Sequence, residues 1–77
     1  MSHRAARPSL LARLARKRAI DLYDAWLFAA ADATLALASW HTALDGERGD
    51  AYAAYVAALD REEHAALRFQ LGVGRAA

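Results

Sequence analysis

The chain has 77 residues, a hydrophobic fraction of 57%, no cysteine and a formal net charge of +1. A single core is marginal at this length without disulfides, a metal or oligomerisation, and the missing cysteine excludes disulfides and thiolate metal sites. Much of the hydrophobic fraction is alanine, the strongest helix former, so we expect one almost wholly helical domain that gains further burial from a partner.

The N-terminal segment is strongly basic. Residues 1–18 hold six of the ten Lys and Arg residues and no acid, so their net charge is +6. The rest of the chain has four Lys and Arg residues and nine acids, so its net charge is −5. We expect residues 1–8 to be flexible, and a basic arm to follow on a helix; the arm consists of Arg13, Arg16, Lys17 and Arg18. Such an arm could bind the acids of a second subunit, an acidic protein surface or the phosphates of a nucleic acid. A membrane surface is a poorer match, because the arm has no Trp or Phe on its apolar side.

A first helix is predicted over residues 9–44. Pro8 suits a first helical turn, Ser9 suits the N-cap, and nothing breaks the helix before Leu44. At 100° per residue, its core stripe holds Tyr23, Trp26, Ala30, Ala33, Leu37, Trp40 and Leu44. A second apolar stripe on the opposite side holds Leu10, Leu14, Phe28 and Leu35. One small partner helix cannot cover both stripes, so we predict that the second is a weak exposed face or the seam of an oligomer.

The segment LDGERGDAY predicts the turn, at residues 45–49. Gly46 is expected as a left-handed helix terminator and Asp50 as the next N-cap. A second helix is predicted over residues 50–71, ended by Gly72, with residues 73–77 as a tail. A short connection makes the helices antiparallel neighbours, and the longer first helix then leaves residues 9–21 overhanging.

Two polar residues interrupt the apolar stripe that we predict for the second helix. Glu63 and Gln70 lie in line with Tyr52, Val56, Leu59, Ala66 and Leu67. We expect Glu63 to bend toward solvent or bond Thr34, and Gln70 to meet the indole N–H of Trp26. Buried polar residues of this kind set register or oligomer state, so Glu63 and Gln70 are predicted to set the register.

A metal site in this stripe is the sharper alternative, because helical bundles hold paired metals with inward Glu residues and a Glu-x-x-His motif. This chain lacks the motif. His64 instead shares a row with Asp60 and Arg68 at i, i+4 and i+8, which is typical of a solvated charged face. We therefore predict no metal and no cofactor.

Several function classes find no support in the sequence. The first apolar run begins only at Ala25 and contains Asp32, unlike a secretory signal, and a membrane span would carry Asp24 and Asp32 through lipid. There is no cysteine nucleophile, no serine with a placed histidine and acid, and no glycine-rich phosphate loop. We expect a cytoplasmic protein that is not an enzyme.

The pattern YDAW at residues 23–26, a Trp at 40 and AYAAYVAALDREEHAAL at 51–67 resembles small uncharacterised alanine-rich two-helix proteins of high-GC bacteria. The resemblance covers residues 20–67. It implies a helical hairpin and brings no activity with it.

Together these observations predict an all-α, antiparallel two-helix hairpin that dimerises into a coiled-coil-like four-helix bundle. Its expected function is protein–protein interaction or assembly, as a homodimer or within a larger complex. The expected interaction residues are Leu10, Leu14, Phe28 and Leu35, with Trp26 and Trp40 packing inside. The alternative is a nucleic-acid-associated accessory protein that places its basic arm on phosphates.

Overall fold

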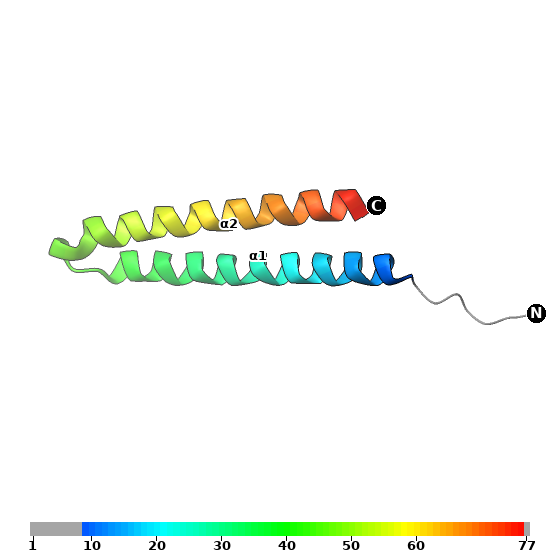
Figure 1. Ribbon diagram of the computed structural model, residues 1–77. Coiled ribbons are helices and arrows are strands. Elements are labelled where there is room, and N and C mark those ends of the chain that lie inside the picture. The colour runs from blue at the N-terminus through cyan, green and yellow to red at the C-terminus, as the bar shows by residue number, and fades with distance from the viewer. Residues whose placement is uncertain (1–8, 77) are drawn as a thin grey trace, which may run out of the picture.

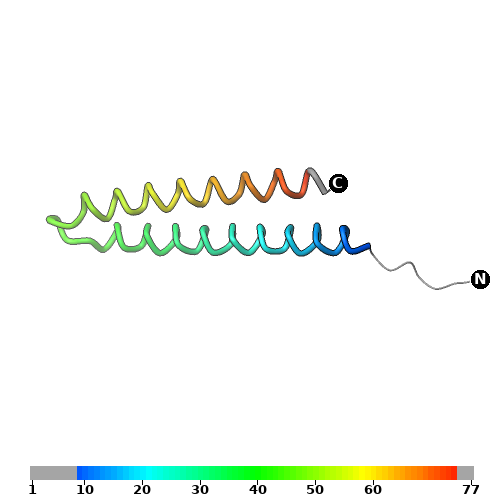
Figure 2. The backbone as a smooth tube through the Cα atoms, viewed as in Figure 1, coloured from blue at the N-terminus to red at the C-terminus, as the bar shows by residue number. Residues whose placement is uncertain are grey.

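The structure is a computed structural model that describes residues 9–76 as two long helices joined by a short turn (Figure 1). Helix α1 spans Leu10–Thr42, the short 3-10 helix η1 spans Asp45–Glu47, and α2 spans Arg48–Ala76. The described part of the chain is all-helical, and the chain folds back so that α1 and α2 lie side by side (Figure 2). The predicted flexible segment 1–8 lies outside the described residues.

Helix α1 begins where the sequence predicts. The side chain of Ser9 accepts a hydrogen bond from the backbone N–H of Ala12 at 3.0 Å, which satisfies one of the unpaired donors of the first turn. Its other end differs from the prediction, because α1 stops at Thr42 and the next two residues, Ala43 and Leu44, are extended.

The turn does not use the predicted left-handed glycine. No glycine of the described chain has a positive φ, so Gly46 is not a left-handed terminator. The reversal comes instead from the extended backbone of Ala43 and Leu44, after which η1 leads directly into α2. Helix α2 therefore starts at Arg48, two residues before the predicted N-cap Asp50.

Gly72 does not end the second helix, as the sequence had suggested; α2 continues through it to Ala76. A Cβ atom placed on Gly72 would lie 2.5 Å from Cδ1 of Leu22. The glycine thus allows α2 to approach α1 closely, and it need not adopt a terminating conformation. Because α2 continues to Ala76, residues 73–76 are helix rather than tail, and the predicted overhang of α1 shortens to about residues 10–17.

The two helices meet along one seam with alternating steps of three and four residues, the spacing of a coiled coil. We call it the core seam; it consists of Leu22, Trp26, Ala29, Ala33, Ala36 and Trp40 of α1 and Ala51, Tyr55, Ala58, Glu62, Ala65, Phe69 and Gly72 of α2. Each of these residues is buried or half-buried, and Ala33 and Ala58 are only 5% and 2% exposed.

Aromatic clusters hold the two ends of the core seam. Near the open end, the rings of Trp26 and Phe69 stack with centroids 5.8 Å apart. Near the turn, Trp40 stacks on Tyr55 at 5.8 Å and tilts against Tyr52 at 4.9 Å. The end of α1 thus contacts the start of α2, and the two helices run in opposite directions past each other (Figure 1).

Candidate protein-interaction surface

A second seam follows each helix one residue further along the chain than the core seam. It has the same three–four spacing and lies about 100° around each helix from the core. We call it the open seam; it consists of Ile20, Tyr23, Leu27, Ala30, Thr34, Leu37 and His41 of α1 and Tyr52, Val56, Leu59, Glu63, Ala66, Gln70 and Val73 of α2.

The two halves of the open seam share one side of the hairpin. Both are displaced in the same rotational sense from the core seam, and the helices run in opposite directions, as the contacts of Trp40 with Tyr52 and of Trp26 with Phe69 show. Two right-handed helices related in this way bring such displaced residues to the same side. The open seam is therefore one continuous two-helix face.

This face leaves large apolar side chains in contact with solvent. Leu27 is 47% exposed and Tyr52 is 50% exposed, and the same holds for other members. The bulky exposed residues of the open seam are Ile20, Tyr23, Leu27, Tyr52, Val56, Leu59 and Val73. Leu67, which is also exposed, lies next to the seam on α2. By contrast, only Leu22, Ala33 and Ala58 of the described residues are buried, with 8%, 5% and 2% of their surface exposed. Apart from Leu22 and the aromatic rings of the core seam, the hairpin covers small residues and exposes large ones, which is the pattern of an interaction surface.

Four polar residues lie in the open seam, two on each helix. They are Thr34, His41, Glu63 and Gln70, and all four are exposed. The Thr34 hydroxyl donates to the backbone carbonyl oxygen of Ala30 at 3.1 Å. Glu63 is the single acid or base among the α2 members of this seam.

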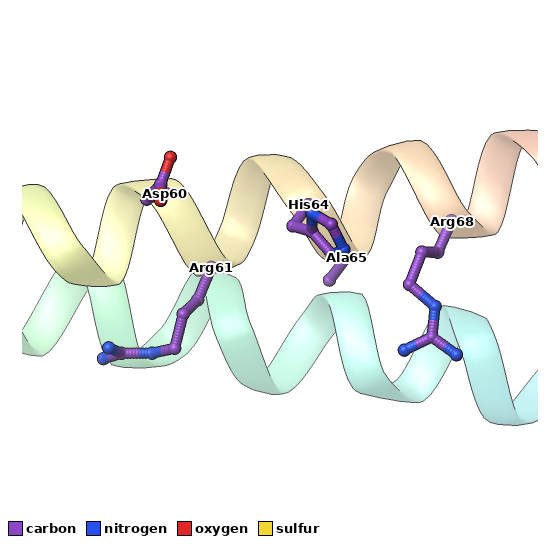
Figure 3. A pocket seen from close by; sticks show the side chains of 5 residues that line it. All are labelled: Asp60, Arg61, His64, Ala65 and Arg68. Atoms are coloured by element: carbon purple, nitrogen blue, oxygen red, sulfur yellow. The ribbon is translucent and has the colours of Figure 1, made fainter.

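The opposite side of the hairpin is charged. Asp60, Arg61, His64 and Arg68 line a shallow hollow with Ala65, and Figure 3 shows Arg61 and Arg68 reaching from α2 toward α1 while Asp60 points away. The predicted row of Asp60, His64 and Arg68 is thus an exposed charged face. At its basic end, Lys17 forms an exposed ion pair with Asp21 at 3.2 Å, which contributes little to stability.

The residues predicted to interact divide into two groups in the structure. Trp26 and Trp40 are half-buried in the core seam. Phe28 is 73% exposed and Leu35 is 67% exposed, but both lie on the far side of α1 from the open seam, close to Asp24 and Asp32 on the helical wheel. Leu10 and Leu14 are also exposed, at the basic end. A seam built on these four residues stays a prediction.

Glu63 is exposed to solvent, which was one of its two expected outcomes, but the position of the stripe that holds Glu63 and Gln70 differs from the prediction. Neither lies between the two helices; the carboxylate there belongs to Glu62, whose Oε2 accepts a hydrogen bond from Trp26 Nε1 at 3.1 Å. The expected contact of Gln70 with the Trp26 indole is therefore wrong. The physical reason is that helices joined through small residues place Ala and Gly in the contact, so the larger residues of the predicted stripe turn outward.

The open seam as a whole was missed from the sequence, although its spacing was visible there. Tyr23, Ala30 and Leu37 were assigned to the core, and Leu27 and Ile20 were assigned to no face. The signal that finds the seam is the second three–four repeat, offset by one residue from the first on both helices.

In comparisons with known proteins, no family model, no curated protein and no solved structure matches this chain. The resemblance to alanine-rich two-helix proteins therefore stays a prediction. Within residues 9–76, no helix combines the length and the apolar character that a membrane crossing needs. In that same part of the chain, no three His, Asp or Glu side chains gather where a metal ion would fit.

Proposed function

We propose that this chain is a non-catalytic protein-interaction module, an antiparallel helical hairpin that binds a helical protein surface through its open seam. Binding of a second hairpin would complete a four-helix bundle, in which each helix packs against two neighbours through two adjacent seams. The observation that carries the proposal is the continuous face of bulky, solvent-exposed residues with coiled-coil spacing. We include a cytoplasmic location in the proposal; a fold that uses no disulfide needs no oxidising compartment.

The size of the face supports this function. From Ile20 to His41 the open seam is roughly 33 Å long, and two neighbouring helices with their side chains are about 20 Å wide. The flat footprint is then about 650 Å², close to the roughly 800 Å² that each partner buries in a stable complex. The footprint also includes the four polar residues of the seam, so it is comparable with the roughly 300–600 Å² of the largest apolar patch on a typical monomer, a patch that is often functional.

Site-specific photo-crosslinking tests the proposal. A photo-reactive phenylalanine analogue is placed at Leu27, in the open seam, or at Phe28, the next residue on the far side of α1, in cells that express the full chain. We expect irradiation to join the Leu27 variant to another protein chain and to leave the Phe28 variant as a single chain. Phe28 is the more exposed of the two, at 73% against 47%, so random labelling would favour the control. Equal labelling at both positions, or none at Leu27, contradicts the proposal.

A second candidate function is supported by the exposure of the basic arm. Arg13, Arg16, Lys17 and Arg18 are all exposed along the first three turns of α1, where they would follow the phosphates of a nucleic acid. This function requires an affinity for duplex or single-stranded DNA that falls steeply with added salt. Undetectable binding at about 50 mM salt, where phosphate contacts are strong, removes it.

A further inference from the structure

We infer that the partner on the open seam is a second copy of this chain, related to the first by a two-fold axis that lies in the interface and runs across the helices. This axis stacks α1 on α1 of the second copy and α2 on its α2, and each stacked pair is antiparallel. The inference rests on the proposed function and adds the identity of the partner, its direction and its register. Four features of the described residues support it.

The contacts within one hairpin determine which residues meet in such a dimer. Trp40 contacts Tyr52 near the turn, and Tyr23 contacts Phe69 near the open end. Open-seam residues on the same level therefore have numbers that add up to 93, such as 41 and 52 or 23 and 70. An axis at the level of residues 32 and 61 makes the numbers of facing residues add up to 64 on α1 and to 122 on α2. Both sums match the three–four spacing of the open seam, with the pairs 23 and 41, 27 and 37, and 30 and 34 on α1, and 52 and 70, 56 and 66, and 59 and 63 on α2.

The first feature is a layer that consists only of residues with polar groups. A layer is the set of four residues, two from each copy, that share one level of the four-helix bundle. At this register, Tyr23 and Gln70 of one copy share a layer with His41 and Tyr52 of the other. Tyrosine hydroxyls, the glutamine amide and neutral imidazole all donate and accept hydrogen bonds, so the four groups can pair with one another. Polar layers inside a helical seam fix its register, because a shift leaves their groups unpaired.

The second feature is the adjacent layer, which is wholly apolar. Leu27 and Ala66 of one copy share it with Leu37 and Val56 of the other. Three of these four side chains are large and one is small, so the layer fills the space between four helices without a polar group in it. By symmetry the polar layer and the apolar layer each occur twice, once on each side of the axis.

The two central layers combine small residues on α1 with long residues on α2. Each holds Ala30 and Glu63 of one copy with Thr34 and Leu59 of the other. The Thr34 hydroxyl can turn from the carbonyl oxygen of Ala30 and donate to the Glu63 carboxylate on its level. The two Glu63 residues lie in different layers, roughly 6 Å apart along the helix axis.

The third feature is charge. The same register brings residues 16–18, which are Arg, Lys and Arg, over the turn of the second copy, residues 45–50. That turn carries the acids Asp45, Glu47 and Asp50 and the single cation Arg48. The basic end of each α1 thus covers an acidic turn, once at each end of the dimer. Complementary charges of this kind orient two partners and suppress other arrangements.

The fourth feature is the cost of the alternatives. An axis parallel to the helices stacks α1 on α2 of the second copy and gathers both basic ends at one end of the dimer, where like charges repel. It also places both Glu63 carboxylates in one layer. Moving the perpendicular axis to the neighbouring register, with sums of 57 and 129, surrounds Glu63 with Leu27, Ala30 and Ala66. The carboxylate then has no polar partner, which is destabilising.

Disulfide trapping tests the partner and the arrangement together, since the chain has no cysteine of its own. Full-length Ala30→Cys and Thr34→Cys variants, one of them tagged, are mixed in a thiol–disulfide buffer. The control replaces Ala30→Cys by Ala31→Cys, the next alanine along α1, which is exposed and lies away from the open seam. Two thiols that face each other in a dimer have a high effective concentration, so we expect the mixed 30–34 disulfide to exceed the control product about tenfold or more.

A second pair keeps the test decisive if either substitution disturbs the hairpin. Val56→Cys and Ala66→Cys probe the contact between the two α2 helices, with Ala30 and Thr34 intact. Far-UV circular dichroism verifies the helix content of every variant. Mixed disulfides above the control at either pair, from folded variants, support the inference.

A third mixture distinguishes the two directions of the axis. Ala30→Cys and Glu63→Cys face each other only if the axis is parallel to the helices. We expect this mixture to give less mixed disulfide than Ala30→Cys with Thr34→Cys.

Three outcomes overturn the inference. Dominant 30–63 linking means that α1 stacks on α2. A dimer that gives no mixed disulfide above the control at either expected pair has a different arrangement. A chain that sediments at the 8.4 kDa of one copy at tens of micromolar, without mixed disulfides, is not its own partner; if Leu27 then photo-crosslinks to a different protein, the proposed function stands and only the inference fails. If Leu27 crosslinks to nothing, both fail.

Discussion

Replacement of Glu62 tests the hydrogen bond that joins the two helices inside the core seam. The Trp26 indole N–H donates to the Glu62 carboxylate over 3.1 Å in a half-buried site. A hydrogen bond to a charged group contributes about 1.5–3 kcal/mol, and the lower end applies where water still has access. We therefore expect Glu62→Ala to lower the free energy of unfolding by about 1.5 kcal/mol. Glu62→Gln keeps an acceptor oxygen and should cost roughly 0.5 kcal/mol.

Urea unfolding followed by far-UV circular dichroism, at one fixed protein concentration, measures these changes. In thermal unfolding the Glu62→Ala change corresponds to a decrease in Tm of about 6–12 °C for a domain of this length. A double-mutant cycle with Trp26→Phe isolates the pair, because the phenyl ring cannot donate. The expected coupling free energy between Trp26 and Glu62 is about 1 kcal/mol.

A parallel cycle with Gln70→Ala supplies the control. Sequence alone favoured Gln70 as the partner of the Trp26 indole, whereas the structure places Gln70 in the open seam, exposed. We expect coupling between Trp26 and Gln70 to be within about 0.3 kcal/mol of zero. A larger coupling for Gln70 than for Glu62 would refute the register of α1 against α2 described above.

Two further changes test the close approach of the helices. Gly72→Ala should destabilise the hairpin by about 1 kcal/mol, since the new methyl group meets buried Leu22. Gly74→Ala is the control: a Cβ atom there has nothing within 4 Å, so alanine should stabilise the helix by up to ~0.5 kcal/mol. Urea unfolding measures both changes in the free energy of unfolding, and equal changes for the two variants contradict the close approach at Gly72.

The helical content and the reversal of the chain could be predicted from sequence because they depend on local signals. Alanine content, the Ser9 cap and the polar segment around residues 45–50 each act within a few residues. The exact ends were less predictable. Gly72 has the composition of a terminator, but its role depends on Leu22, fifty residues earlier in the chain.

Local signals do not predict which face of each helix is buried. Hydrophobic periodicity gives most weight to large residues, and it therefore mixed Tyr23 and Leu37 of the open seam with Trp26 and Trp40 of the core seam. Two helices in close contact instead select small residues at most contact positions, with a few aromatic rings filling the gaps. The alanines carry this information, but they occur on every side of both helices and hide the period.

The division of residues between the seams explains why association is expected to complete the fold. Burial of a side chain stabilises by about 0.8 kcal/mol per CH₂ group, so a contact built on Ala33 and Ala58 gains little, and the aromatic clusters at its ends supply most of the favourable term. The larger aliphatic side chains, Leu27 and Leu59 among them, lie on the open seam and contribute only when a second helical surface covers them. A hairpin with this distribution folds mainly on its aromatic contacts and gains further stability when a partner covers its large aliphatic side chains, which ties its stability to the concentration of that partner. Glu63 and Gln70 then limit which partners can bind, because a wholly apolar partner would bury both side chains without hydrogen bonds.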